Sequence, residues 1–366
     1  MANSVVIGAG WHPVLFRKEA SQLIDSCEFV HAHALVCESS QAKRLASRSS
    51  LVAEVFSPGG LVSIDNAIES IADAFLSLNL GGTVAVKSSR SGNKIEGWSG
   101  REVAGEVGGL LVNKGREINL SKPDVTLRIH LLAPSNSTTH PDDFVAEPIV
   151  AWGITTYEGD DWVERKAPHR PFFKPVSLDP KLARAMVNIA CPNGGRFLDP
   201  FCGTGGLIIE GILCGMDCFG SDLAWPMVIG TRDNAIWAKE RGGTGSYEIR
   251  NGSATDLSKI WDGPFDGFAF DPPYGRNAWK SADGFDLLEG ALAECHSLAS
   301  ENANLVTLLP WPPTSISESI ESGISFGKSW SEISSSFSKA GWQIVSTSTI
   351  RVHRSLARLL IHAVRK

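Results

Sequence analysis

The segment from Arg196 to Gly206 constrains the fold of this chain more than any other. Its first residues, Arg-Phe-Leu, read as a short buried strand that ends at Asp199, and Gly203 and Gly205 lie in the turn that follows. An apolar segment with the character of a helix comes next, LIIEGILCG. This order is typical of an open α/β sheet, in which ligands bind outside the carboxyl ends of the strands. A plain strand-to-helix turn is the structural alternative.

Two further acids follow the next predicted strands. Asp222 closes the strand CFGSDL about 20 residues after Asp199, a distance at which an acid commonly binds ribose hydroxyls. Asp256 follows the third strand in NGSATDL, where it could accept a hydrogen bond from an adenine amine. Each acid alone is more often a solvated loop residue or a helix cap, but three in succession favour an adenosine-type ligand. The turn matches neither GxxxxGK[ST] nor GxGxxG, which argues against nucleoside triphosphates and dinucleotides.

The most specific signal is the tetrapeptide Asp271-Pro272-Pro273-Tyr274, which follows the apolar strand FDGFAF. An amine on a base or an amide is a poor nucleophile, because its lone pair is delocalised. The carboxylate of Asp271 and the carbonyl of Pro272 can accept its two N–H bonds, while the prolines stiffen the loop. Tyr274 offers a flat face on which a planar base can stack. A proline-rich turn capped by a surface tyrosine is the structural alternative.

The composition of the chain limits the classes of protein to which it can belong. The chain has 366 residues, 43% of them hydrophobic and 20% charged, which is normal for a globular protein of two or three domains. It contains no apolar run long enough to cross a bilayer, and we expect neither a signal peptide nor a membrane partner. Seven cysteines without zinc-site spacing predict reduced thiols, a cytoplasmic protein and no metal.

Short β-rich runs alternate with helical patterns along the whole chain. In the first part we expect strands at 4–10, 28–37, 51–56, 83–89 and 125–132, with helices at 15–24, from Asp65 to about Leu78, and at 99–113. Residues 57–60 (SPGG) are expected to end the strand before them. A turn-rich segment at 134–143 marks a boundary, and EPIVAWGITTYEG after it predicts a hairpin or a pair of linker strands. From Lys174 onward the rhythm is that of a doubly wound sheet.

Together, DPFCGTGG, the two acids after it and DPPYG resemble the S-adenosylmethionine-dependent amino-methyltransferases of the Rossmann-like class. The resemblance implies S-adenosyl-L-methionine as the cofactor. Its methionine part would lie against Asp199, Gly203 and Gly205, its ribose against Asp222 and its adenine against Asp256. The catalytic residues would be Asp271, Pro272, Pro273 and Tyr274. The motif gives the class of enzyme and leaves the substrate open.

Segments on either side of the motifs resemble a narrower family. These segments, PFFKPVSLDPKLARAMVNIA (171–190) and RVHRSLARLL (351–360), are similar to the archaeal tRNA guanine-10 N2-methyltransferases. A eukaryotic relative works with a small activator subunit, which is therefore a candidate partner here. Residues 83–132 resemble a THUMP domain, a module that binds tRNA. The implied order is a ferredoxin-like part over 1–50, THUMP over 51–135, a linker over 136–170 and a Rossmann-like methyltransferase domain over 171–366.

A tRNA partner requires basic side chains against phosphates, whereas the formal net charge of the chain is −6. We expect the phosphate contacts from basic residues of the THUMP-like and C-terminal segments, namely Lys87, Arg90, Lys94, Arg101, Lys114, Arg354 and Arg358. Arg170, Lys174 and Arg351 could extend this path toward the catalytic pocket. Arg354 and Arg358 would share one face of a single strand. Pairing with nearby acids is the alternative, as is a solvated face of mixed charge.

The resemblance implies methylation of the exocyclic N2 of a guanine in tRNA, at position 10. The same chemistry at guanine 6 and a catalytically silent tRNA-binding protein are the alternatives. A DNA adenine or cytosine methyltransferase is disfavoured, because the N-terminal half resembles an RNA-binding module. A protein glutamine methyltransferase would more often have asparagine in place of Asp271. The sequence leaves open the number of methyl groups, the choice of tRNA and the oligomeric state.

Overall fold

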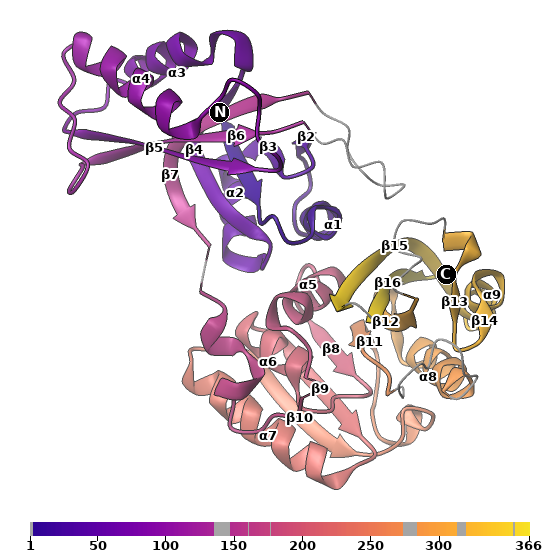
Figure 1. Ribbon diagram of the computed structural model, residues 1–366. Helices are drawn as coiled ribbons and strands as arrows, with labels where there is room; N and C mark the ends of the chain where they lie inside the picture. Colours follow the sequence, from indigo (N-terminus) through magenta and orange to yellow (C-terminus); the bar gives the residue numbers. More distant parts are fainter. Residues whose placement is uncertain are drawn as a thin grey trace. The chain divides into compact units, whose positions relative to one another are not determined.

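The computed structural model describes most of the chain in two compact units, Met1–Asp160 and Asp161–Lys366 (Figure 1). The described residues are 3–134, 147–159, 161–175, 177–273, 284–312, 320–353 and 356–366. Among the helices in these ranges, none is long and apolar enough to span a membrane.

The first unit is built on a seven-stranded sheet with the order β2-β3-β1-β4-β7-β6-β5. β5 and β6 pair in parallel, and the other neighbouring strands pair antiparallel. Along the chain the strands are β1 (Asn3–Gly8), β2 (Glu28–His31), β3 (Ala34–Glu38), β4 (Val52–Ser63), β5 (Val84–Ser91), β6 (Val125–Leu132) and β7 (Ile149–Glu158).

In the described part of this unit, four α-helices accompany the sheet, namely α1 (Pro13–Leu23), α2 (Ser39–Arg48), α3 (Ala67–Ser77) and α4 (Gly100–Asn113). The last two lie side by side (Figure 1); α4 contacts β5 and β6, whereas α3 contacts β4 and β7. α4 buries Val103, Val107 and Leu111, whose four-residue spacing places them on one face of a helix. They share a core with Phe75 of α3 and Leu127 of β6. The amphipathic pattern that predicted these helices therefore also determines which face they bury.

Several details of the first unit correct the sequence prediction. Residues 28–37 form the two strands β2 and β3 rather than one. β4 continues through the predicted stop at Pro58, because a bulge opposite β7 accommodates the proline without breaking the pairing. Asp65 does not cap α3; it lies in a 3₁₀ turn, Ile64–Asn66, and the helix begins at Ala67.

The prediction that residues 136–170 form a linker is also partly wrong. β7 lies inside residues 136–170, yet it is a single strand that pairs with both β4 and β6. Its Val150 and Ala151 are fully buried. The expected parts 1–50 and 51–135 thus contribute to one continuous sheet, and the boundary between the two units falls beyond β7.

The second unit contains a seven-stranded sheet with the order β10-β9-β8-β11-β12-β16-β15. Its first five strands are parallel, and β16 lies antiparallel between β12 and β15. The strands are β8 (Arg196–Asp199), β9 (Asp217–Asp222), β10 (Ser246–Asn251), β11 (Phe265–Phe270), β12 (Ala299–Trp311), β15 (Trp342–His353) and β16 (Leu356–Arg365). The strand order reverses between β8 and β11, so a ligand crevice is expected outside their carboxyl ends. This sheet confirms the predicted doubly wound α/β class.

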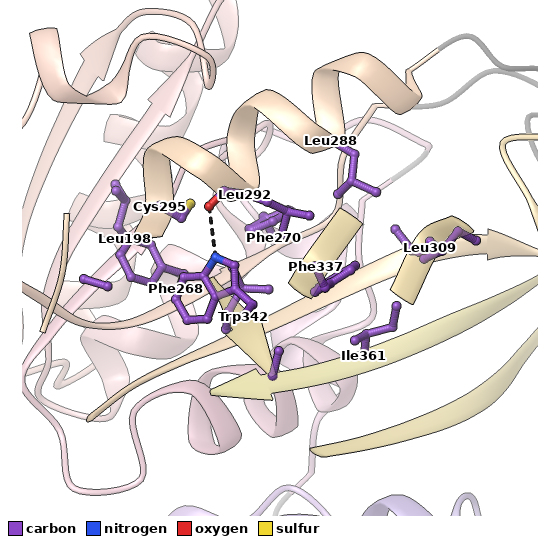
Figure 2. Close-up of a cluster of buried hydrophobic side chains, with 14 of the residues drawn as sticks. Leu198, Phe268, Phe270, Leu288, Leu292, Cys295, Leu309, Phe337, Trp342 and Ile361 are labelled. Atoms are coloured by element: carbon purple, nitrogen blue, oxygen red, sulfur yellow. Dashed lines mark hydrogen bonds between the residues drawn. The ribbon is translucent and has the colours of Figure 1, made fainter. Parts of the chain in front are cut away.

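The helices of this unit are α5 (Pro180–Ala190), α6 (Gly206–Leu213), α7 (Trp225–Glu240), α8 (Phe285–Ser297) and α9 (Trp330–Lys339). A short hairpin, β13 (Ile324–Ser325) and β14 (Lys328–Ser329), precedes α9. Figure 2 shows the core between the sheet, α8 and α9, where the buried indole of Trp342 packs edge-on against Phe268. Its Nε1 donates a hydrogen bond of 2.9 Å to the carbonyl of Leu292. The start of β15 is thereby tied to α8 through a satisfied buried polar group.

The C-terminal segment 351–360 differs from its prediction. It contains the reversal between β15 and β16, with Arg351 opposite Ala357, rather than one continuous strand. β15 ends at His353 and β16 begins at Leu356, and Arg358 lies in the second of these strands; Arg354 lies outside the described residues.

Candidate active site

The sheet of the second unit brings three predicted site residues to one edge. β8 is hydrogen-bonded to β9 on one side and to β11 on the other. Asp199 is the last residue of β8, Asp222 is the last of β9, and Asp271 directly follows β11. Three carboxylates from distant parts of the sequence thus occur where the strand order reverses.

The turn after β8 needs glycine at two positions for different reasons. Gly203 and Gly205 have φ angles of 51° and 76°, a left-handed conformation that favours glycine. A Cβ added at Gly205 would lie 2.9 Å from Cγ2 of Thr231 on α7, so the glycine permits close approach of that helix. A Cβ at Gly203 would meet only the carbonyl of Phe201, at 3.7 Å. Gly203 therefore borders open space.

Asp222 fixes this turn. Its carboxylate accepts hydrogen bonds from the backbone N–H of Gly203 at 3.0 Å and of Ala224 at 2.8 Å. The hydroxyl of Thr231 donates to the carbonyl of Gly203 at 2.8 Å. Leu223, which follows the acid, is 77% exposed. An apolar surface therefore lies next to the acid predicted to bind ribose, a feature that the sequence analysis did not use.

The side chain of Asp199 also stabilises this turn. Its side chain is buried and accepts a hydrogen bond of 3.0 Å from the N–H of Phe201. Burial raises the pKa of Asp199 well above its ordinary value, the Phe201 hydrogen bond opposes this shift, and the carboxylates of Asp222 and Asp271 raise it further. The three acids therefore interact electrostatically.

Asp256 lies farther along, beyond the end of β10. It precedes the 3₁₀ turn Leu257–Lys259 and forms an ion pair of 2.5 Å with Lys259. The two side chains are 46% and 77% exposed, so solvent screens the pair. Its assignment to adenine stays a prediction.

Asp271 and Arg358 form an ion pair, with Nη1 at 2.6 Å from Oδ2. Their side chains are only 20% and 13% exposed. The structure thus shows for Arg358 the pairing with a nearby acid that was its alternative, and its contact with phosphate stays a prediction. Pro272 is buried and Pro273 is exposed, while Tyr274 lies outside the described residues.

A segment that the sequence analysis did not assign to the site packs against the turn. We call residues 170–175 with 177 and 178 the strap. The backbone N–H of Phe172 donates a hydrogen bond of 3.0 Å to Oδ1 of Asn234, and Nδ2 of Asn234 donates one of 2.6 Å to the carbonyl of Phe172. Asn234 also donates to the carbonyl of Thr204 at 2.8 Å, and the hydroxyls of Ser177 and Thr204 are 3.0 Å apart. The strap thus holds the glycine turn against α7.

Arg170 is the first residue of the strap, and the prediction that it contacts RNA is wrong. It is only 4% exposed, and its Nε donates to the carbonyl of Arg165 at 2.8 Å. Lys174, in contrast, is exposed.

The predicted RNA contacts of the first unit lie on its surface. Lys87 and Arg90 are exposed on β5, the edge strand of the sheet, and Lys94 and Arg101 are exposed near the start of α4. Lys114, at the end of α4, forms an exposed ion pair of 2.5 Å with Asp73. Their contacts with RNA stay predictions. In the described ranges, no group of three or more His, Cys, Asp or Glu side chains is arranged to hold a metal ion.

The sheet order, the glycine turn and the acids at the switch point define the second unit as a Rossmann-like methyltransferase fold. Residues 168–313, less than half of the chain, match the family described as "RMKL-like, methyltransferase domain".

Similar proteins extend this assignment. The chain is 30% identical over 253 residues to the tRNA (guanine(10)-N2)-dimethyltransferase of Pyrococcus abyssi, a match that covers 69% of this chain and 65% of that one. It is 40% identical over 146 residues to the enzyme of the same description from Methanothermobacter thermautotrophicus, covering 39% and 42%. The matches thus span less than two thirds of these relatives. The crystal structure of TrmN from Thermus thermophilus is similar over 100% of both chains, with a TM-score of 0.52 and 17% identity, and therefore shares the fold.

Proposed function

We propose that this protein transfers a methyl group from S-adenosyl-L-methionine to the exocyclic N2 of guanine 10 in tRNA. The observation that carries the proposal is the edge where Asp199, Asp222 and Asp271 meet beside a glycine turn. The two archaeal relatives described by their guanine-10 activity support the substrate.

The residues at this edge fit the cofactor. Gly203 borders open space next to the carboxylate of Asp222, and a carboxylate can accept hydrogen bonds from both ribose hydroxyls. The exposed side chain of Leu223 offers apolar surface for a base. Asp199, Gly203 and Gly205 would hold the methionine part, Asp222 the ribose and Asp256 the adenine. When bound, the cofactor supplies an electrophilic methyl group on a positively charged sulfur.

The protein contributes orientation and charge. Asp271 and the carbonyl of Pro272 would accept the N–H bonds of the guanine amine and direct its lone pair toward the methyl group, while Tyr274 would stack on the base. N2 would gain the bond to the methyl carbon that the sulfonium sulfur loses, with S-adenosyl-L-homocysteine as the leaving group, and N2 would lose one proton, which Asp271 or water would accept. Alignment of two reactants accounts for much of the rate gain in such reactions. A guanine in a stem must first leave its stack, at a cost of a few kcal/mol.

The first unit would bind the tRNA. We assign to it the ferredoxin-like and THUMP parts, with phosphate contacts from Lys87, Arg90, Lys94 and Arg101, all exposed. The seven cysteines, all of them in the described ranges, are not joined in disulfides, which agrees with a reducing compartment, and we place the reaction in the cytoplasm. A requirement for an activator subunit is tested by assaying the chain alone.

The test is methylation of defined tRNA transcripts by the purified chain, followed by nucleoside mass spectrometry and mapping of the modified position. We expect N2-methylated guanosine at position 10, and the mass distinguishes one methyl group from two. Asp271→Ala should abolish the product while tRNA affinity stays unchanged. A product at guanine 6 would reassign the substrate. Cofactor binding without any methylated guanosine, in the presence or absence of an activator, would contradict the proposal.

A further inference from the structure

We propose that Arg358 is a positioning residue for Asp271, holding its carboxylate in the orientation that accepts the N–H of the target amine. The inference rests on the proposed function and adds to the motif a residue that lies 87 positions away in the sequence.

The sheet explains how the two residues meet. β12 lies between β11 and β16, with Thr307 opposite Phe270 and Pro310 opposite Arg358. The antiparallel direction of β16 places its beginning beside the carboxyl ends of the parallel strands (Figure 1). A long arginine side chain can therefore cross the end of β12 to reach the residue that follows β11.

The contact is suited to orientation. Nη1 of Arg358 donates to Oδ2 of Asp271 at 2.6 Å, and both side chains are largely shielded from solvent. A guanidinium is planar and permanently charged, so it restrains the plane of a carboxylate more than a lysine does. A carboxylate offers about four lone-pair positions, and this contact is compatible with accepting from an amine as well.

The surrounding charges give the pair a second effect. Asp271 lies within electrostatic range of the buried Asp199, which also interacts with Asp222. Three carboxylates at one edge repel one another, and each is easier to ionise beside a cation. Arg358 supplies such a cation to the acid that the mechanism uses.

The experiment compares Arg358→Met, Arg358→Lys and wild-type protein in tRNA methylation, with the dissociation constants of cofactor and tRNA measured separately. For Arg358→Met we expect kcat to fall on the order of 100-fold, as for a misplaced catalytic group, with both dissociation constants unchanged. Arg358→Lys should recover part of kcat because it keeps the charge. Arg250→Met is the matched control, since Arg250 pairs with Glu248 at 2.5 Å on β10 of the same sheet.

Three results would overturn the inference. An unchanged kcat in Arg358→Met would show that Asp271 needs no such partner. Weaker tRNA binding with an unchanged kcat would make Arg358 a phosphate contact. If Arg358→Met and Arg358→Lys lost the same amount of kcat and the same amount of thermal stability, the ion pair would have only a structural role. Failure of the proposed function is separate, because the wild-type protein itself would then methylate no tRNA guanine.

Discussion

The backbone N–H of Gly203 donates a hydrogen bond of 3.0 Å to the carboxylate of Asp222. One side chain at the end of β9 therefore holds the turn that follows β8. Because the same carboxylate also accepts from Ala224 at 2.8 Å, it ties this turn to the start of α7. A change at Asp222 should affect both the shape of the turn and any ligand that the turn binds.

Asp222→Ala should weaken S-adenosylmethionine binding by on the order of 10- to 100-fold, the usual effect of losing hydrogen bonds to a charged group. Isothermal titration calorimetry measures the change. Asp217→Ala is the control, because Asp217 lies exposed at the opposite end of β9, where its carboxylate accepts a hydrogen bond of 2.6 Å from the hydroxyl of Ser246. Equal affinities for the Asp222 and Asp217 variants would remove Asp222 from the cofactor site.

Gly230→Ala should destabilise the protein by about 1–3 kcal/mol, the usual cost of overpacking. An added Cβ would lie 2.1 Å from the ring of Phe172, which belongs to the strap. Because the strap also contacts Thr204 in the glycine turn, cofactor affinity should fall as well. Urea unfolding and calorimetry measure the two effects.

The control for this variant is Gly109→Ala in α4, where nothing lies within 4 Å of an added Cβ. There the substitution should stabilise by about 0.5–1 kcal/mol, because alanine favours a helix. If Gly230→Ala were equally well tolerated, the packing of the strap against α7 would be refuted.

The double variant Lys87→Ala/Arg90→Ala should weaken tRNA binding and flatten its salt dependence. Each lost phosphate contact lowers the slope of log affinity against log salt by roughly 0.7–0.9. Filter binding at several salt concentrations gives the slope. Lys43, exposed on α2, provides the control substitution to alanine. An unchanged slope in the double variant would remove both residues from the RNA surface.

Acidification should destabilise the first unit through His130. This side chain is 5% exposed and lies between the hydroxyls of Ser89 and Ser91, at 2.7 and 2.9 Å. Burial lowers the pKa of His130 from 6.5 to about 3, and the nearby charges of Arg128, His33 and His31 contribute. The unfolded chain therefore binds this proton first, so stability is complete above pH 6.5 and is lost as the pH falls toward 3.

At pH 5 this effect amounts to about 2 kcal/mol for His130. Urea unfolding at pH 7.5 and pH 5 should show a loss that is smaller in His130→Asn, whose amide does not titrate, by about that amount. The same loss in both proteins would mean that other groups cause the acid sensitivity.

The sequence predicts best those features that depend on neighbouring residues. The strand, glycine turn and helix around Gly203 are local, and so is the placement of Asp222 at the end of a strand. The resemblance to methyltransferases, which the match over residues 168–313 confirms, is also local in this sense. It rests on short motifs, and the residues within each motif are adjacent in the sequence. β7 was missed as a sheet strand because its partners β4 and β6 are far away in the sequence and its alternation also fits a hairpin.

Arg358 shows the opposite case. Its basic side chain in a basic segment predicted an RNA contact, whereas its partner is decided by the insertion of β16 beside β12. No local pattern contains that information. The role of the strap could not be predicted for the same reason, because it depends on a contact with Asn234 of α7, which lies far away in the sequence. Tyr274 and Arg354 lie outside the described residues, and their roles stay predictions.

The position of β16 has a consequence for how the second unit folds. This strand is the last of its sheet to be synthesised, yet it occupies an interior place between β12 and β15. A nascent chain that stops short of Leu356 would present the bare edge of β12 and lack the guanidinium beside Asp271. We therefore expect the proposed methyl transfer only from a chain that includes β16, and none from a fragment that ends before Leu356.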